Sequence, residues 1–265
     1  MSFLLDVLKS IVFGCVQGIS AWLPFSSRAH LILLQSLWPI MPEWYYRMFL
    51  VFVSTGSAFA ILVLFYRQLF LKRSFFRVWK SIVLASLPIV GFGMLLSYWI
   101  ESVMSAKFVV AILLIAYGII LIGYAKHPVR AKYHSFYELG ANEAVQFGLV
   151  QSLALFPGTS WLASGLLGGR FLKLERKASL LFSYLVSACS IVALNLFQFS
   201  MFFKDGYPLS FFQGFCGLLS AVCSFIVGIF IVRWWMRVFG EQSLRWVGFY
   251  RIALGLFMIV FFYIF

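Results

Sequence analysis

Long apolar stretches dominate the chain, and most of them run for about the 20 residues that an α-helix needs to cross the hydrocarbon core of a membrane. Two further apolar stretches, residues 3–38 and 142–170, are each interrupted by a proline that is followed by hydroxyl side chains. The pattern predicts an all-α integral membrane protein with a single membrane domain over residues 1–265. The uninterrupted stretches are predicted to be full spans, at roughly 47–66, 78–100, 106–124, 178–202, 210–232 and 246–265.

The two interrupted stretches carry similar motifs. Residues 16–27 read VQGISAWLPFSS and residues 150–160 read VQSLALFPGTS, so that Val-Gln, an apolar run, a proline and hydroxyls recur in the same order. Because proline breaks a helix and hydroxyls can bond the freed backbone groups, each stretch fits a re-entrant helical hairpin. Paired breaks of this kind point to a site near the middle of the membrane.

The order of the elements predicts an internal repeat. A hairpin and three spans occupy approximately residues 1–124, and a second hairpin and three spans occupy approximately 142–265. Since three spans are an odd number, the second repeat must be inverted relative to the first. The expected fold is therefore an inverted-topology repeat, in which each half is a re-entrant helical hairpin plus three transmembrane helices.

Composition and charge agree with a membrane protein. The chain is 63% hydrophobic, with a mean hydropathy of +0.98, and only 11% of its residues are charged, against about 25% in a soluble domain. The net charge of +13 could indicate a nucleic-acid partner, but the excess of Lys and Arg in the cytoplasmic loops of membrane proteins explains it more simply. We therefore expect the membrane, and no nucleic acid, as a partner.

The distribution of charge also predicts the orientation of the chain. When the predicted spans are followed in order, most Lys and Arg fall on one side, in the segments 67–80, 125–141, 170–177 and 233–245. By the positive-inside rule this side is cytoplasmic, so both termini and the first hairpin should open to the outer side. The second hairpin should enter from the cytoplasm. The outer side then carries only the short loops 101–105 and 203–209.

Candidate chemistry gathers just after the proline of the first hairpin. Ser26, Ser27, Arg28 and His30 follow Pro24 within six residues. A cation, an imidazole and two hydroxyls are costly to bury in a membrane, and together they suit an anionic head group. Arg28 would be the charge partner, and His30 could serve as an acid or base. The alternative is that the serines only cap a helix and the imidazole only bonds a neighbouring carbonyl.

The second hairpin and the last span add further candidates. Thr159 and Ser160 are hydroxyl donors, and Gly158 allows close backbone approach, although glycines also serve helix packing in membranes. Arg251 lies inside the last span, where an ionisable residue suggests function by default. It could equally extend to the membrane surface or hold the carbonyls of another helix. None of the eight acidic residues lies in either proline motif, so the sequence predicts a cationic site without a metal ligand.

The chain resembles a known family, the undecaprenyl-pyrophosphate phosphatases linked to bacitracin resistance. Residues 16–30 are similar to the family's first signature motif and residues 151–160 to its second. The resemblance covers the whole chain, because further similar segments are found at 56–57, 65–67, 182–185 and 250–251.

This resemblance implies a bacterial inner-membrane enzyme that hydrolyses undecaprenyl pyrophosphate to the monophosphate and so recycles the lipid carrier of cell-wall biogenesis. It implies a polyprenyl pyrophosphate or phosphate lipid as partner, a serine of the first motif as nucleophile, and a divalent cation, Mg²⁺ or Ca²⁺, held by glutamates. The resemblance leaves open whether the protein forms a homodimer.

The chain departs from the family at several of these positions. Gln17 and Ala21 replace the glutamates, Arg28 replaces a threonine, and Trp161 replaces the arginine that clamps phosphate. Gln17 keeps hydrogen bonding without the charge, and Arg28 would supply the lost cation from the opposite hairpin. The catalytic residues expected are Ser26, Ser27 and His30, and the substrate-binding residues expected are Gln17, Arg28, Gly158, Thr159, Ser160 and Arg251.

Whether this chain hydrolyses its lipid stays open on the sequence, because removing a phosphate clamp can cost several kcal/mol of transition-state stabilisation. One alternative is a catalytically inactive homologue that binds or flips a polyprenyl phosphate. Another is a different lipid phosphate, recognised by Arg28.

Overall fold

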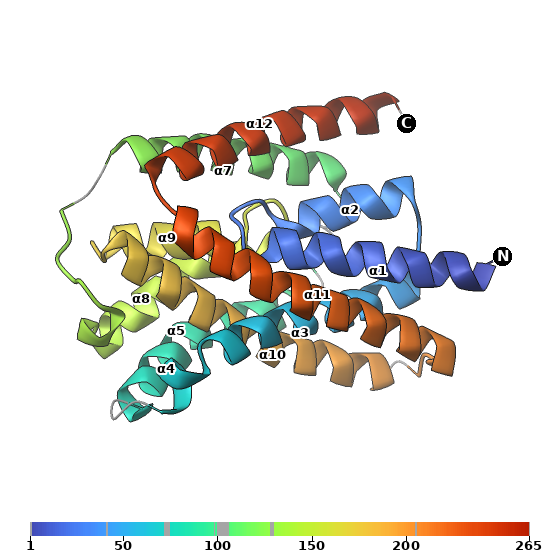
Figure 1. Cartoon of the computed structure of the whole chain (residues 1–265), viewed down its shortest axis with the longest axis horizontal. Coiled ribbons are helices and arrows are strands. Elements are labelled where there is room, and N and C mark those ends of the chain that lie inside the picture. The colour runs from blue at the N-terminus through green and yellow to red at the C-terminus, as the bar shows by residue number, and fades with distance from the viewer. Residues whose placement is uncertain are drawn as a thin grey trace.

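The computed structural model describes residues 2–40, 42–71, 75–97, 99, 106–127, 130–204 and 206–264, and these residues form a bundle of α-helices (Figure 1). The predicted loop 101–105 and the predicted cytoplasmic cations Lys72 and Arg73 lie outside the described residues. In chain order the helices are α1 (Ser2–Ala21), α2 (Ser27–Leu37), α3 (Glu43–Leu64), α4 (Tyr66–Phe70), α5 (Phe75–Leu95), α7 (Lys107–Lys126), α8 (Ala141–Gln151), α9 (Trp161–Phe171), α10 (Arg176–Lys204), α11 (Phe211–Val238) and α12 (Glu241–Ile264). Two short 3-10 helices, η1 (Phe136–Glu138) and η2 (Ser152–Leu155), also form.

Within the described residues, 7 helices are long and apolar enough to cross a membrane, which confirms the predicted all-α integral membrane fold. Six of them match the predicted full spans, and the seventh is α1. The sequence pattern treated α1 as one leg of a hairpin, but its 20 residues make a helix of about 30 Å. The other hairpin helices, α2, α8 and α9, have 11 residues each. The first hairpin is therefore unequal, with one leg of spanning length.

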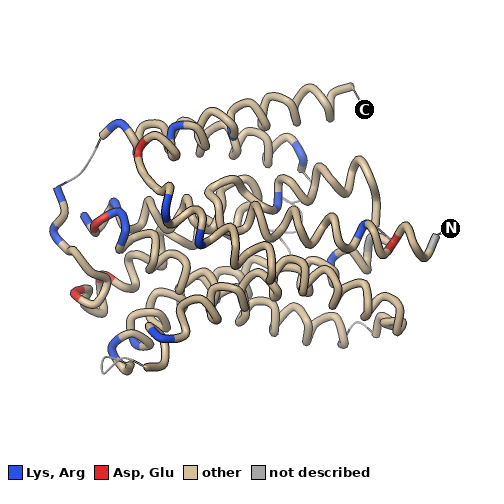
Figure 2. The backbone as a smooth tube through the Cα atoms, in the orientation of Figure 1, with Lys and Arg blue, Asp and Glu red and all other residues tan. Residues whose placement is uncertain are grey.

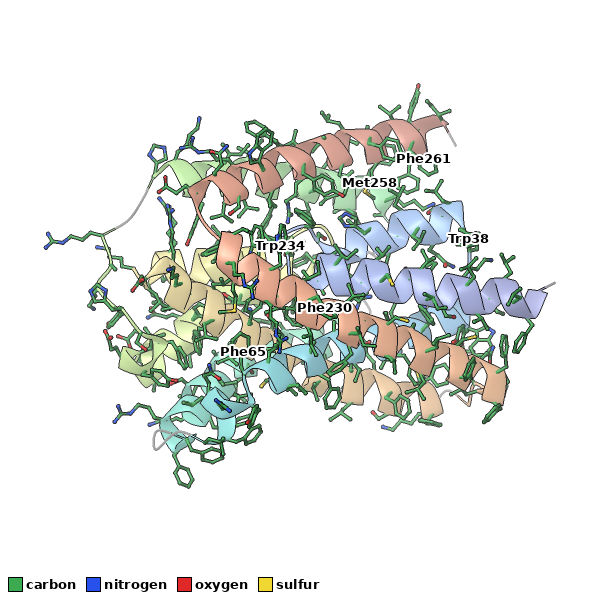
Figure 3. All side chains as sticks on the ribbon, in the orientation of Figure 1. Trp38, Phe65, Phe230, Trp234, Met258 and Phe261 are labelled. Atoms are coloured by element: carbon green, nitrogen blue, oxygen red, sulfur yellow. The ribbon has the colours of Figure 1, made fainter. Side chains whose placement is uncertain are left out.

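Large apolar side chains lie on the outside of the bundle. On α11, Phe230 is 66% exposed and Trp234 is 50% exposed (Figure 3). Leu87 of α5 and Ile112 of α7 are each 58% exposed. A protein surrounded by water rarely exposes so much contiguous apolar surface, whereas lipid tails are a favourable environment for it. The chain is a multi-pass membrane protein.

The two hairpins enter the bundle from opposite ends. In Figure 1, α1 and α2 come from the end that carries both termini, and α8 and α9 come from the other end. The breaks between their legs, residues 22–26 and 156–160, meet near the middle of the bundle. This arrangement is compatible with the predicted inverted repeat.

Helix packing repeats in a similar way in the two halves. Helix α1 packs on α11, and α8 packs on α5; α3 contacts α11, and α10 contacts α5. Gly14 and Gly148, each two residues before the valine that begins its motif, lie at the first two contacts. A Cβ atom at Gly14 would overlap the Ser220 carbonyl, and one at Gly148 would overlap the Ala85 carbonyl. Equivalent glycines thus permit equivalent close helix contacts.

Charge is distributed unevenly along the bundle. Figure 2 shows most Lys and Arg at the end opposite the two termini. This is the gathering on one side that the sequence predicted, and the end that faces the cytoplasm stays a prediction.

Candidate functional site

Both helix breaks end in a serine with an unusual backbone conformation. Ser26 precedes α2 with φ 75°, and Ser160 precedes α9 with φ 81°. Positive φ is uncommon outside glycine and costs conformational energy, so it persists only where the surroundings enforce it. The two breaks therefore share a local geometry as well as a sequence motif.

Hydrogen bonds join the two breaks to each other. The backbone N–H of Gly158 donates to Ser26 Oγ at 3.1 Å, and Ser160 Oγ donates to the Leu23 carbonyl at 3.5 Å. From α10, the buried Tyr184 hydroxyl donates to the Trp22 carbonyl at 3.0 Å. The structure thus brings the two proline motifs together at one place.

Arg251 of α12 lies behind this junction and is fully buried. Its Nη1 donates to the Pro24 carbonyl at 2.7 Å, and its Nη2 donates to the Gly158 carbonyl. Its guanidinium also lies over the Tyr117 ring, 5.6 Å from the centroid. Arg251 therefore satisfies carbonyls that the two breaks leave without helical partners. This geometry corresponds to the alternative that the sequence left open, in which Arg251 holds the carbonyls of another segment.

A cavity of about 610 Å³ lies beside the junction. Arg28 of α2, Arg47 of α3 and Lys107 at the start of α7 supply three cations to its wall, and no Asp or Glu is among its described lining residues. Ser27 and Gln17 add polar groups, and the Gln17 amide donates to Ser57 Oγ at 3.3 Å. Its apolar wall includes Ile32, Leu50, Leu155, Ile191 and Leu194. The cavity combines a cationic polar region with an apolar wall.

Of the residues that the sequence proposed as a site, Gln17, Ser27 and Arg28 line this cavity. The others are not among its described lining residues, and their polar groups form hydrogen bonds within the protein. His30 Nδ1 lies 2.8 Å from the Ser26 carbonyl and Nε2 lies 2.7 Å from the Tyr250 hydroxyl of α12. Thr159 Oγ1 donates to the carbonyls of Leu153 and Phe156 at 2.8 and 2.6 Å. Ser26, Gly158, Ser160 and Arg251 hold the junction together, as described above.

Sequence reasoning missed several lining residues. Arg47 and Lys107 lie near the ends of predicted spans, where Lys and Arg are common and carry no special signal. Tyr46 and Asn195 lie inside apolar helices and also line the cavity. The only sequence feature that could have identified Asn195 as a candidate site residue is that it is a polar residue within a predicted span. Trp161, which stands where the resembled family has its arginine, contributes an uncharged wall.

The lining residues do not fit a divalent cation held by the protein. Mg²⁺ and Ca²⁺ bind oxygen ligands and depend on carboxylates. Within the described part of the chain, no group of three or more His, Cys, Asp or Glu side chains could hold a metal ion. Gln17 and Ala21, where the resembled family has glutamates, both line the cavity and carry no charge.

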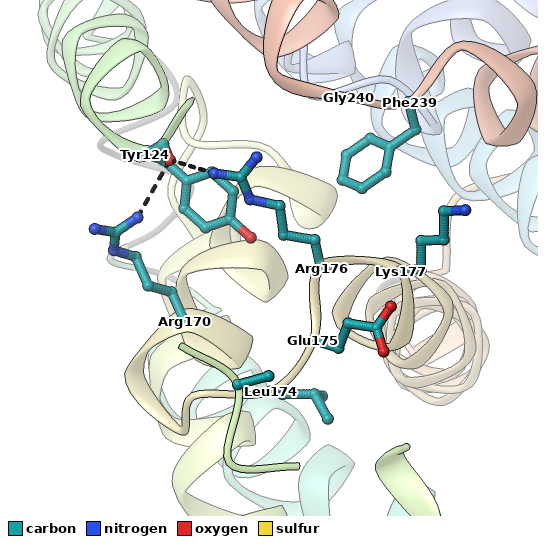
Figure 4. Close-up of a pocket in the computed structure, with 9 residues that line it drawn as sticks. Tyr124, Arg170, Leu174, Glu175, Arg176, Lys177, Phe239 and Gly240 are labelled. Atoms are coloured by element: carbon teal, nitrogen blue, oxygen red, sulfur yellow. Dashed lines mark hydrogen bonds between the residues drawn. The ribbon is translucent and has the colours of Figure 1, made fainter. Parts of the chain in front are cut away.

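A second, smaller cavity of about 360 Å³ lies at the end rich in Lys and Arg (Figure 4). Arg170 donates to the carbonyls of Tyr124 and His127 at 3.2 and 2.6 Å, and Arg176 donates to the Tyr124 carbonyl at 3.2 Å. Arg176 also pairs with Glu241 at 3.0 Å. These arginines cap the carbonyl end of α7, where cations are favourable. The larger cavity is lined by Gln17 and Ser27 of the first proline motif and by Pro157 of the second, and it is the candidate site.

Comparison with known proteins gives consistent results. The family model described as bacitracin resistance protein BacA matches residues 10–257. The chain is 31% identical to undecaprenyl-diphosphatase 1 of Clostridioides difficile, over 98% of each chain. It is 30% identical to an undecaprenyl-diphosphatase of Streptococcus thermophilus, over 98% of this chain and 94% of that one. It is 31% identical to an undecaprenyl-diphosphatase of Aquifex aeolicus, over 96% of this chain and 98% of that one.

Proposed function

This chain belongs to the bacitracin resistance protein BacA family, and from that premise we propose that it hydrolyses undecaprenyl pyrophosphate to the monophosphate in the larger cavity. The observation that carries the proposal is the meeting of Ser27 with three cations in one membrane cavity. A pyrophosphate cannot enter such an environment without compensation, because an unpaired buried charge is very costly. Arg28, Arg47 and Lys107 supply that compensation, and the apolar wall suits the first isoprene units of the lipid.

Ser27 is the proposed nucleophile. It is the first residue of α2, so the backbone N–H groups of that helix end are available to an anion beside its hydroxyl. Ser27 Oγ attacks the terminal phosphorus, the bond to the bridging oxygen breaks, and undecaprenyl monophosphate leaves. The hydroxyl proton passes to a phosphate oxygen of the substrate, because no carboxylate or imidazole is among the described lining residues. Water then cleaves the seryl phosphate and releases inorganic phosphate.

The remaining residues of the predicted site hold the reacting groups in place. Phosphoryl transfer depends mainly on placement of the groups and on neutralisation of charge. Ser26 and His30, which the sequence placed with Ser27 as catalytic residues, act in this proposal as positioning residues through their bonds at the break. Gln17, which lines the cavity, is held by its hydrogen bond to Ser57 of α3. No step uses a divalent cation.

The test is the release of inorganic phosphate from undecaprenyl pyrophosphate by the purified protein in detergent micelles. Binding of undecaprenyl monophosphate is measured on the same preparation. Release with turnover supports the proposal. Binding without release would contradict hydrolysis and would favour the alternative, a protein that binds or flips the lipid.

The proposal places the chain in the bacterial inner membrane with both termini outside the cytoplasm. The cavity is lined by the start of α3 and the start of α7, and both lie toward the end that carries the termini (Figure 1). The lipid head group would then be reached from the outer side. A reporter at the C-terminus should be found outside the cytoplasm and one within residues 125–141 inside it; finding both on the same side would exclude this orientation.

A further inference from the structure

One tyrosine in the cavity wall has a hydroxyl without a hydrogen-bond partner among the residues that the structure describes. Tyr46 lines the larger cavity and is only 9% exposed. Its hydroxyl is buried and has no hydrogen-bond partner among the described residues. Seven other buried polar atoms share this property, on Ser86, Gln151, Ser190, Ser224, Trp235, Arg245 and Arg251, but none of those residues lines the cavity. Tyr46 is therefore distinguished by its position at the candidate site.

The neighbouring residue provides a contrast. Tyr45 is also buried, but its hydroxyl donates to the Gln213 carbonyl of α11 at 2.6 Å, and it does not line the cavity. Two adjacent tyrosines on α3 thus have opposite roles. The hydroxyl of Tyr45 joins two helices, whereas the hydroxyl of Tyr46 makes no hydrogen bond to any of the described residues.

An unpaired buried hydroxyl is a cost to the folded protein. Native proteins keep few such groups, because each loses its bonds to water and gains none in return. The cost is recovered when a ligand supplies an acceptor. Around this cavity the ligand must be anionic, since Arg47 follows Tyr46 directly, and Arg28 and Lys107 contribute to the same wall.

We propose that Tyr46 is a ligand-binding residue whose hydroxyl donates a hydrogen bond to a phosphate oxygen of the bound lipid. The inference rests on the proposed function and extends it to a residue outside both proline motifs. A hydrogen bond to a charged acceptor is stronger than one between neutral groups. A phosphate oxygen is therefore a better partner for this hydroxyl than a carbonyl or a water molecule.

The test compares Tyr46→Phe with Tyr45→Phe, each of which removes a single oxygen atom. Three probes are used on the full-length protein in detergent micelles: undecaprenyl monophosphate, undecaprenol and inorganic phosphate. Thermal unfolding is measured in parallel without any probe. The alcohol separates the contribution of the phosphate from that of the tail, and inorganic phosphate separates a lipid site from a site for the free anion.

Tyr46→Phe should weaken binding of undecaprenyl monophosphate at least about tenfold, or 1.4 kcal/mol. It should leave undecaprenol binding unchanged and the unfolding temperature equal or higher. Tyr45→Phe should lower the unfolding temperature and leave lipid affinity unchanged. Equal affinity of wild type and Tyr46→Phe would overturn the inference and leave the proposed function standing. Failure of the wild type to bind undecaprenyl monophosphate would overturn both. Tighter binding of inorganic phosphate than of the lipid would overturn the assignment to a lipid head group.

Discussion

The two helix breaks have similar sequences and similar backbone conformations, yet they present different side chains to the cavity. After Ser26 the first break continues with Ser27 and Arg28, both of which line the cavity. After Ser160 the second break continues with Trp161, which lines it without charge, and Leu162, which is 1% exposed in the core. Two similar sequence motifs thus present polar side chains to the cavity at the first break and apolar ones at the second.

This difference indicates that the first break supplies the polar groups of the candidate site. The hydroxyls of the second break are bonded to backbone: Thr159 to Leu153 and Phe156, and Ser160 to Leu23. These bonds replace helical bonds lost at the break. The first break leaves Ser27 and Arg28 at the cavity and takes its support from the second, through Gly158 and Ser26. We therefore regard the second hairpin as the scaffold of a site that the first hairpin builds.

The strongest test of this division is the loss of one hydroxyl from each break. Ser27→Ala should lower phosphate release from undecaprenyl pyrophosphate at least about 10³-fold, because it removes the nucleophile. Ser160→Gly, which suits the positive φ at that position, should lower it less than about tenfold. Both rates are measured with protein of equal thermal stability. Comparable losses in the two variants would mean that the breaks share the chemistry.

The next prediction concerns Arg251, whose hydrogen bonds to both breaks should stabilise them together. Arg251→Leu leaves the carbonyls of Pro24 and Gly158 without their donor and should destabilise the fold by about 3 kcal/mol. The measurement is denaturant or thermal unfolding in detergent, with lipid affinity determined separately. If stability were unchanged and only lipid affinity fell, Arg251 would be the substrate-binding residue that the sequence suggested.

A third prediction asks whether Arg28 of the first break binds phosphate in place of the arginine that the family has at the position of Trp161. Arg28→Ala should weaken binding of undecaprenyl monophosphate at least about tenfold, or 1.4 kcal/mol. Arg28→Lys should keep part of the affinity, because it keeps the charge without the bidentate geometry. Arg170→Ala in α9 is the control, since Arg170 belongs to the smaller cavity, and it should leave lipid affinity unchanged. An unchanged affinity in folded Arg28→Ala would show that Arg28 only extends to the membrane surface.

The smallest expected effect is that of divalent cations. Removing them with EDTA should change lipid affinity less than about twofold, because the cavity neutralises phosphate with side-chain cations and has no carboxylate ligands among its described residues. The double variant Gln17→Glu and Ala21→Glu places two carboxylates one helical turn apart in α1, on the cavity wall. In that variant, lipid affinity should depend on Mg²⁺. A wild-type affinity that collapses in EDTA would contradict neutralisation by side chains alone.

The comparison also separates what could be predicted from what could not. The breaks at Pro24 and Pro157 were predictable, because a proline removes a helical hydrogen bond wherever the helix lies. The polar character of Ser27 and Arg28 was likewise visible in the sequence. That His30 contacts α12 instead of the cavity was not, since the direction of a side chain on a short helix depends on which neighbour the helix packs against.

A helical membrane protein with two interrupted segments could be predicted from the sequence alone. Both properties are local: apolar runs partition into lipid, and a proline followed by hydroxyls marks each break, whereas Pro88, without such hydroxyls, lies inside the continuous helix α5. The packing of the helices in space was needed to show that Tyr46, Arg47 and Lys107 share a cavity with Ser27 and that Arg251 bonds to both breaks at the junction. These residues lie on four helices, α2, α3, α7 and α12. Their convergence is fixed by close packing between helices, such as the contact at Gly14, which no single segment encodes.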